Sequence, residues 1–208
     1  KEQALALLRV ISAKDLRDIE LEVLRDHLTN TQPLEAFASD AALVMNYIYN
    51  PRVSTEPLTS YKSLFLSAVP QELQKAFRSS PEALRQWCIR SITIDEANNP
   101  LSYPIEPLGV WRTRRADRHS LGIFFVSLAR TMGWPARIDG VTGKVQYYEG
   151  KAWHDVTFEA KAHKATAQQG TLRLSYKDNG IIDNPKYYYQ FTLSRFGKDG
   201  SLDLLSYD

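Results

Sequence analysis

The hydrophobic positions near the start of the chain recur at helical spacing. Between residues 12 and 28 the apolar side chains repeat every three or four residues, and charged side chains fill the intervals. They are Leu16, Ile19, Val23, Leu24 and Leu28. Ser12 followed by Asp15 is a capping pattern, because the serine oxygen can accept a free backbone amide. We therefore predict one amphipathic surface helix over 12–28, preceded by another over 1–11.

Three later segments also predict helices. Residues 40–49 are apolar almost all round, so we expect a buried helix that Pro51 ends. Ser80-Pro81-Glu82 is a strong helix start. Residues 120–132 carry bulky apolar side chains on most faces and precede Gly133, so we expect a central helix with Ile123, Phe124 and Leu128 in the core. By contrast, residues 98–118 contain three prolines without periodicity and predict a long loop.

Strand patterns replace helical ones after Pro135. Alternating segments separated by Gly-containing turns predict strands over 136–141, 143–148, 152–158, 171–176, 187–196 and 201–207. Helices that precede an antiparallel meander are typical of the α+β class. We divide the chain into a helical N-terminal part, 1–79, and a core with C-terminal antiparallel strands, 80–208, and expect one compact unit.

Composition narrows the classes of partner. The 208 residues include 26 Lys and Arg against 24 Asp and Glu, a net charge of +2, which argues against nucleic acid as a partner. No apolar run is long enough to span a membrane. Cys88 is the single cysteine, so the chain has neither an internal disulfide nor a CxxC pair. Because the sequence begins at Lys1 rather than Met, we expect a piece of a longer protein.

Residues 120–158 resemble the transglutaminase-like core. The shared pattern is a buried helix followed by Gly-x-Pro-Ala-Arg, here Gly133 to Arg137, with Trp134 where Ile is usual. Trp87 on an upstream helix and Trp153 on a late strand also fit, so the likeness spans about 80–159. The run 141–147 and the Tyr-rich end are similar to domains inside large exported Bacteroidetes proteins. This resemblance implies a papain-like core, a central helix on an antiparallel sheet, in the periplasm or at the cell surface.

The resemblance also implies a chemistry that this chain lacks the residues to perform. In that family a Cys at the helix start, a His on the adjacent strand and an Asp on the next carry out acyl transfer. Counting back about 15 residues from Gly133, four helical turns, reaches Arg118, and no Cys occurs over 116–120. The strand 143–148 has no His, and Thr157 stands at the Asp position. The likeness therefore implies the fold and argues against the activity.

Substitute chemistry has weak support in the sequence. Cys88 lies in mid-helix, which favours a buried inert thiol. Ser120 with His154 is the fallback catalytic pair, although a Ser before an apolar helix is usually its cap. His154 and Asp155 are adjacent on a strand and so point to opposite faces. His119 and His154 lack any accompanying metal-binding motif, and we expect neither a metal nor another cofactor.

Two segments have binding character. Arg112, Arg114, Arg115 and Arg118 precede the central helix, and such a cluster suits a carboxylate, sulfate or phosphate. Alternatively, these arginines pair with Asp95, Glu96, Glu106 and Asp139. The aromatic strand residues could form a carbohydrate or peptide platform, or simply pack the sheet. They are Tyr147, Tyr148, Tyr187, Tyr188, Tyr189 and Trp153.

The sequence thus predicts a catalytically inactive transglutaminase-like module of a larger exported bacterial protein. Its role would be structural or in binding, toward other domains of the same chain or toward an anionic small molecule, peptide or carbohydrate. The predicted vestigial cleft comprises Arg112, Arg114, Arg115, Arg118, His119, Ser120, Tyr147, Trp153 and Thr157. The alternative is an acyl-transfer or amide-hydrolysing enzyme that uses non-standard residues.

Overall fold

Helices fill most of the first 131 residues and short strands follow, so the predicted α+β class is confirmed. The computed structural model describes residues 2–101, 103–159, 172–177, 180, 185–196 and 202–205. The chain groups into two compact units. Unit 1 comprises residues 1–138 and 144–160, and unit 2 comprises 139–143 and 161–208. The division at residue 79 stays a prediction.

The N-terminal helices of unit 1 are shorter than predicted. They are α1 (Glu2–Val10), α2 (Asp15–Asp18), α3 (Leu21–Thr29), α4 (Ala41–Val44) and the π-helical turn η1 (Met45–Tyr49). The helix over 1–11 is confirmed, but the single helix over 12–28 is wrong, because Ile19 and Glu20 adopt extended backbone between α2 and α3. The predicted cap is present, since Ser12 Oγ accepts the Asp15 amide at 3.1 Å.

Five further helices complete unit 1. They are α5 (Tyr61–Ala68), α6 (Gln71–Ser79), α7 (Pro81–Ser91), α8 (Pro107–Thr113) and α9 (Arg118–Thr131). Ser80 Oγ accepts the Glu82 amide at 3.2 Å, which confirms the predicted start of α7. The loop predicted over 98–118 is wrong in its second half. Pro107 opens α8 because the first turn of a helix needs no amide hydrogen there.

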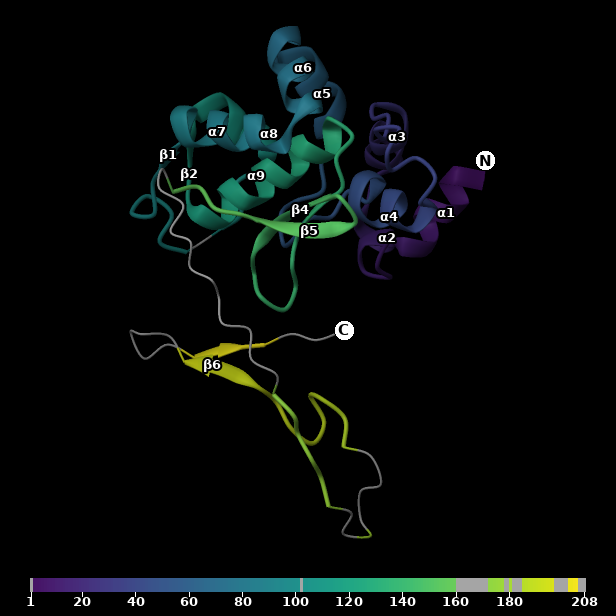
Figure 1. Cartoon of the computed structure of the whole chain (residues 1–208), viewed down its shortest axis with the longest axis vertical. Helices are drawn as coiled ribbons and strands as arrows, with labels where there is room; N and C mark the ends of the chain where they lie inside the picture. Colours follow the sequence, from purple (N-terminus) through teal and green to yellow (C-terminus); the bar gives the residue numbers. More distant parts are fainter. Residues whose placement is uncertain are drawn as a thin grey trace. The chain divides into compact units, whose positions relative to one another are not determined.

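Helix α9 is the centre of unit 1. Every residue from Ser120 to Thr131 is buried, and α5, α7 and α8 lie around it (Figure 1). Phe124 is fully buried between Phe65 and Trp87, with ring centroids 5.8 and 6.1 Å away. The central helix is therefore confirmed. Its cap is Asp117, not Ser120, because the Asp117 carboxylate accepts the Ser120 amide.

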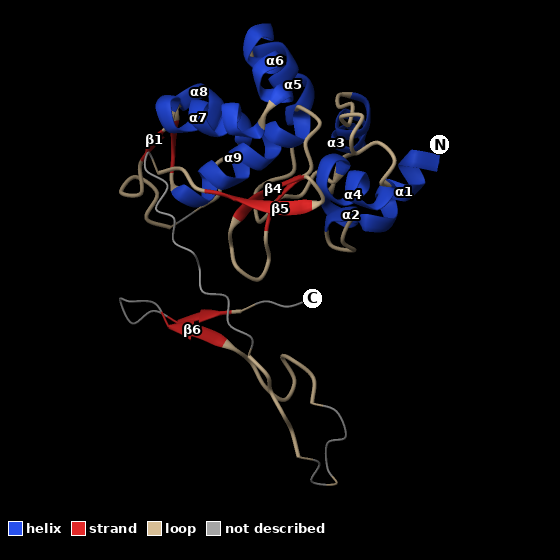
Figure 2. Ribbon diagram, viewed as in Figure 1, coloured by secondary structure: helices blue, strands red, loops and turns tan. Residues whose placement is uncertain are grey.

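A three-stranded antiparallel sheet packs against α9. Strands β3 (Ala136–Ile138), β4 (Val145–Glu149) and β5 (Ala152–Val156) follow one another in that order. Helices α5 to α9 lie on one side of β4 and β5 (Figure 2). Gly122 permits the close approach, since a Cβ there would lie 2.8 Å from Val145 Cγ2. A separate parallel pair joins β1 (Thr93–Ile94) to β2 (Arg115–Ala116) just before α9.

Unit 2 contains less strand than predicted. Its described strands are β6 (Ser194–Phe196) and β7 (Leu202–Leu204), which pair antiparallel. Residues 172–177 form no strand, so that prediction is wrong for the described part of 171–176. Residues 188–190 form a turn within the strand predicted over 187–196. Residues 201, 206 and 207 of the last predicted strand lie outside the described residues.

Candidate functional site

The amino-terminal end of α9 is where the resemblance expects a catalytic cleft. Here Asp117 Oδ1 accepts the Ser120 amide at 2.9 Å, and Asp117 Oδ2 accepts the Ser120 hydroxyl at 2.6 Å. Asn99 Nδ2 donates to the same Oδ2 at 2.7 Å. Burial opposes ionisation of this carboxyl, but the hydrogen bonds from Ser120 and Asn99 outweigh it and lower the pKa of Asp117. The helix start is thus closed by a capping carboxylate.

Ser120 is enclosed and fully engaged. Its side chain is buried, its hydroxyl donates to Asp117, and its oxygen accepts the Ile105 amide at 2.9 Å. The hydroxyl therefore joins the start of α9 to the segment before α8. A hydroxyl that already donates to a carboxylate and accepts a backbone amide is a structural group rather than an exposed nucleophile.

His154 lies toward the other end of α9. It is paired with Tyr147 across the β4–β5 ladder, and Tyr147 is paired with Ala136. The Ala136 carbonyl accepts Arg130 Nε at 2.9 Å, near the carboxyl end of the helix. His154 Nε2 donates to the Glu149 carbonyl at 3.0 Å. The fallback pair of Ser120 and His154 is therefore not brought together.

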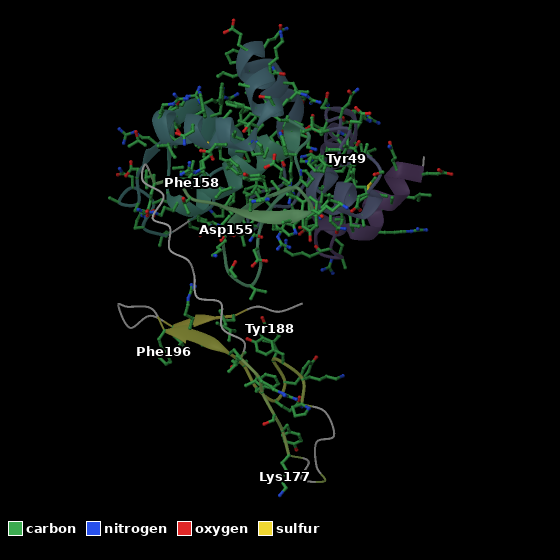
Figure 3. The ribbon with its side chains drawn as sticks, in the orientation of Figure 1. Tyr49, Asp155, Phe158, Lys177, Tyr188 and Phe196 are labelled. Carbon is green, nitrogen blue, oxygen red and sulfur yellow. The ribbon has the colours of Figure 1, made fainter. Side chains whose placement is uncertain are left out.

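Asp155 faces away from His154, as predicted for strand neighbours. Its carboxylate accepts Gln146 Nε2 at 2.8 Å and Lys144 Nζ at 2.5 Å. Figure 3 shows Asp155 on the side of the sheet turned away from the helices. Asp155 therefore belongs to a polar network on the solvent-facing side and does not orient His154.

The arginine cluster is mostly occupied by contacts within the chain. Arg115 Nη1 lies 3.0 Å from Asp95 Oδ2, and Arg118 Nη1 lies 3.2 Å from Glu96 Oε1. The alternative interpretation, pairing with Asp95 and Glu96, is thus confirmed for these two. Both arginine side chains are about two-thirds exposed, so each pair contributes little to stability.

Arg114 is a packing residue. Its backbone is left-handed, with φ of 56°, and its guanidinium lies 3.8 Å from the ring centroid of Trp111 and 4.6 Å from that of Trp87. The two tryptophans stack at 5.1 Å, so the cation covers an aromatic pair. Arg112 is exposed at the end of α8. Anion binding by the cluster stays a prediction.

His119 makes a contact that the sequence did not predict. Its Nε2 lies 3.3 Å from Ser54 Oγ, 65 positions earlier in the chain. In the Ser54 loop, the buried Glu56 carboxylate accepts the Val53 and Ser54 amides at 2.7 and 2.8 Å. Residues so far apart with no shared motif give no sequence signal. Ser54 and His119 are a candidate hydroxyl–imidazole pair.

A cavity of about 670 Å³ adjoins this loop and is lined in part by Ser54. Its charged residues include two ion pairs, Arg52 with Asp15 at 2.5 Å and Lys14 with Asp18 at 3.0 Å, and Glu56, whose carboxylate accepts backbone amides. The Arg52 hydrogen bond is the main reason that the pKa of Asp15 is lowered. The cavity is therefore polar, and acids outnumber bases in its lining.

The strand aromatics of unit 1 do not share one face of the sheet. Tyr148 and Trp153 pair across the ladder with ring centroids 5.3 Å apart. Tyr147 lies on the opposite face and stacks on His154 at 5.4 Å, because neighbouring strand residues alternate. Trp153 is also covered by the Arg137 guanidinium, 4.2 Å from its ring centroid. Tyr187, Tyr188 and Tyr189 belong to unit 2.

The remaining candidates are structural or exposed. Cys88 is fully buried, which confirms its predicted burial, and burial raises the pKa of its thiol. That the thiol is inert stays a prediction. Thr157 is exposed and its carbonyl accepts Arg85 Nε. Among the described residues, no group of three or more His, Cys, Asp or Glu side chains could hold a metal ion. Within the same residues, no helix has the length and apolar character needed to cross a bilayer.

Neither the comparison with protein-family models nor those with curated proteins and solved structures give a match for this chain.

Proposed function

We propose that this chain is a catalytically inactive transglutaminase-like module of a larger exported bacterial protein, located in the periplasm or at the cell surface. The likeness of residues 120–158 supports the family, and the packing of α9 on β3, β4 and β5 is compatible with it. The module would serve in structure, assembly or binding. Its partners would be other domains of the same chain or an anionic small molecule, peptide or carbohydrate.

One observation carries the proposal: the start of α9 is built as a cap. Acyl transfer by this architecture needs a nucleophile at the first turn that an acyl donor and a base can both reach. The first turn here presents Arg118 and His119 to solvent, and it buries Ser120 on Asp117 and the Ile105 amide. These contacts stabilise the helix and use the groups that catalysis would require.

The direct test is an assay for amine incorporation and for amide hydrolysis. The protein is incubated with a glutamine-bearing protein and a fluorescent primary amine, with an authentic transglutaminase as positive control. We expect incorporation and ammonia release equal to those of the buffer. Turnover above buffer that is lost in Ser120→Ala but kept in Ser79→Ala, an exposed serine on α6, would refute the proposal.

The Ser54–His119 contact favours a second candidate function, hydrolysis or acyl transfer by non-standard residues. The 3.3 Å separation is within reach of proton transfer after a small adjustment, and the cavity beside Ser54 could admit an acyl group. The test is hydrolysis of an activated ester by wild type, Ser54→Ala and His119→Ala. Equal loss in both variants, with Ser79→Ala unchanged, would support this candidate. Rates equal to the uncatalysed reaction would exclude it.

A further inference from the structure

The described residues of unit 1 form two apolar clusters. The larger surrounds α9 and includes Tyr61 and Phe65 of α5. The smaller is formed by α1, α4 and η1, and Leu24 and Leu28 of α3 pack against it. Helices α1, α3 and α4 lie together on one side of unit 1 (Figure 1). Leu43 of α4 also packs against the larger cluster, and two buried bases, His27 and Lys62, lie between α3 and α5.

Lys62 is the first of these bases. It is completely buried on α5, and its Nζ donates to the Ile48 carbonyl at 2.8 Å and to the His27 carbonyl at 3.2 Å. Among the described residues no carboxylate oxygen is hydrogen-bonded to this amine. Two carbonyls match the two N–H groups of a neutral amine, whereas the third N–H of an ammonium group would face only the Tyr49 ring, whose centroid lies 5.5 Å from Nζ. The site is thus built for the uncharged form.

His27 is the second base and lies on α3. It is completely buried, and its Nε2 donates to the Thr59 carbonyl at 3.2 Å. Its Nδ1 is buried without a hydrogen-bonding partner. A neutral ring with the proton on Nε2 fits this arrangement. A second proton on Nδ1 would place an unpaired charge in the interior, against the edge contact with Tyr61 at 4.5 Å.

The charged groups around the two bases favour neutrality. Burial first, and then the positive charge of buried Arg130 on α9, lower the pKa of Lys62, while Asp26 on α3 opposes this shift only in part. Burial first, and then the positive charge that Lys62 has when it is protonated, lower the pKa of His27. The other titratable groups nearby are Tyr49 on η1, whose ring lies 5.5 Å from Lys62 Nζ, Tyr61 on α5, and Glu56.

Asp26 links α3 to α5 through two hydrogen bonds whose opening can be measured. Its carboxylate accepts the Lys62 amide at 2.9 Å and the Ser63 amide at 3.0 Å. These are amides of the first turn of α5, so a side chain of α3 caps a neighbouring helix. Separation of α3 from α5 would break both hydrogen bonds and expose both bases.

We propose that His27 and Lys62 form an acid-sensitive latch between the two clusters, and that proton uptake by these bases releases α1, α3 and α4 from α5 and α9. Both bases hold protons less tightly when closed than when open to water. The closed form is therefore favoured at high pH and is lost as pH falls. As pH falls below 10.5, the ordinary pKa of Lys62, proton uptake by Lys62 begins to weaken the closed form. Below 6.5, the ordinary pKa of His27, proton uptake by His27 weakens it further.

The test is hydrogen exchange of the backbone amides at positions 62 and 63 between pH 5.5 and 8.5, with rates corrected for intrinsic exchange. We expect protection to fall by up to about tenfold per pH unit for each proton taken up, with the steeper slope below pH 6.5. Amides in the middle of α9 should keep their protection. Protection at positions 62 and 63 that does not change with pH would overturn the proposal.

Two variants and two matched controls assign the effect. His27→Gln keeps a donor for the Thr59 carbonyl but does not titrate, so it should flatten the slope below pH 6.5. Lys62→Met should flatten the slope above it. His154→Gln and Lys75→Met change exposed residues and should keep the wild-type profile. If Lys62→Met does not fold, His27→Gln alone tests the proposal. The latch would be overturned if the slope of amide protection against pH is unchanged in His27→Gln, or if His154→Gln changes it equally.

Discussion

Gly133→Ala is the most sensitive probe of how α9 ends. Gly133 has φ of +91°, and a Cβ there would lie 2.4 Å from the Gln32 carbonyl oxygen. The left-handed backbone costs a residue with a Cβ about 1–2 kcal/mol. Displacing packed backbone adds about 1–3 kcal/mol, because the Leu34 amide also donates to the Gly133 carbonyl at 3.2 Å. We expect the free energy of unfolding to fall by about 2–5 kcal/mol.

Urea unfolding followed by tryptophan fluorescence measures this change, since Trp134 is buried beside the mutated position. Gly140→Ala is the matched control, because its added Cβ would meet nothing within 4 Å and its φ is not positive. The control should be neutral or more stable by up to about 1 kcal/mol. A Gly133→Ala protein within about 0.5 kcal/mol of wild type would refute both the left-handed turn and the close approach of the Gln32 segment.

Three further predictions concern the core and the helix start. In urea unfolding, Phe124→Ala should lower the free energy of unfolding by about 3–5 kcal/mol. The control Phe196→Ala, at a residue that is 78% exposed, should lower it by less than about 0.5 kcal/mol. Equal losses in the two variants would contradict the burial of α9. Cys88 should react with a thiol reagent only after unfolding, and rapid labelling of the native protein would contradict its burial. Asp117→Ala should cost about 0.5–2 kcal/mol at neutral pH, because the cap is lost. Since the pKa of Asp117 is lowered, the stability that it contributes should be fully present above pH 3.8 and should be lost as pH falls through its pKa in the folded protein. A difference in the free energy of unfolding between wild type and Asp117→Ala that does not change with pH would contradict this.

Local signals in the sequence predicted the element ends that depend on local chemistry. Ser80 and Pro81 start α7, and Gly133 ends the region of α9, because caps and φ preferences act over a few residues. The break between α2 and α3 was missed, since Ile19 and Glu20 are neither Gly nor Pro and carry no breaking signal. Pro107 was misread as part of a loop, although Pro is compatible with the first turn of a helix.

The contacts at the start of α9 depended on long-range packing and were only partly predictable. Opposite charges alone predict that the arginines pair with acids such as Asp95, but they do not predict that Arg115 is its partner. The contact of Ser54 with His119 was not predicted, because nothing in either segment indicates the other. The opposite faces of Tyr147 and Tyr148 follow from strand alternation, so the platform could have been divided at the sequence level.

We propose that the chain has no active nucleophile, and covalent labelling measured by intact mass tests this directly. The native protein is exposed to a fluorophosphonate and, separately, to a chloroacetamide, with a denatured sample as control. We expect no adduct on the native protein and one chloroacetamide adduct, on Cys88, after denaturation. A stoichiometric adduct on the native protein would contradict this expectation if it maps to Ser120 or Cys88, or if it maps to Ser54 and is abolished by His119→Ala.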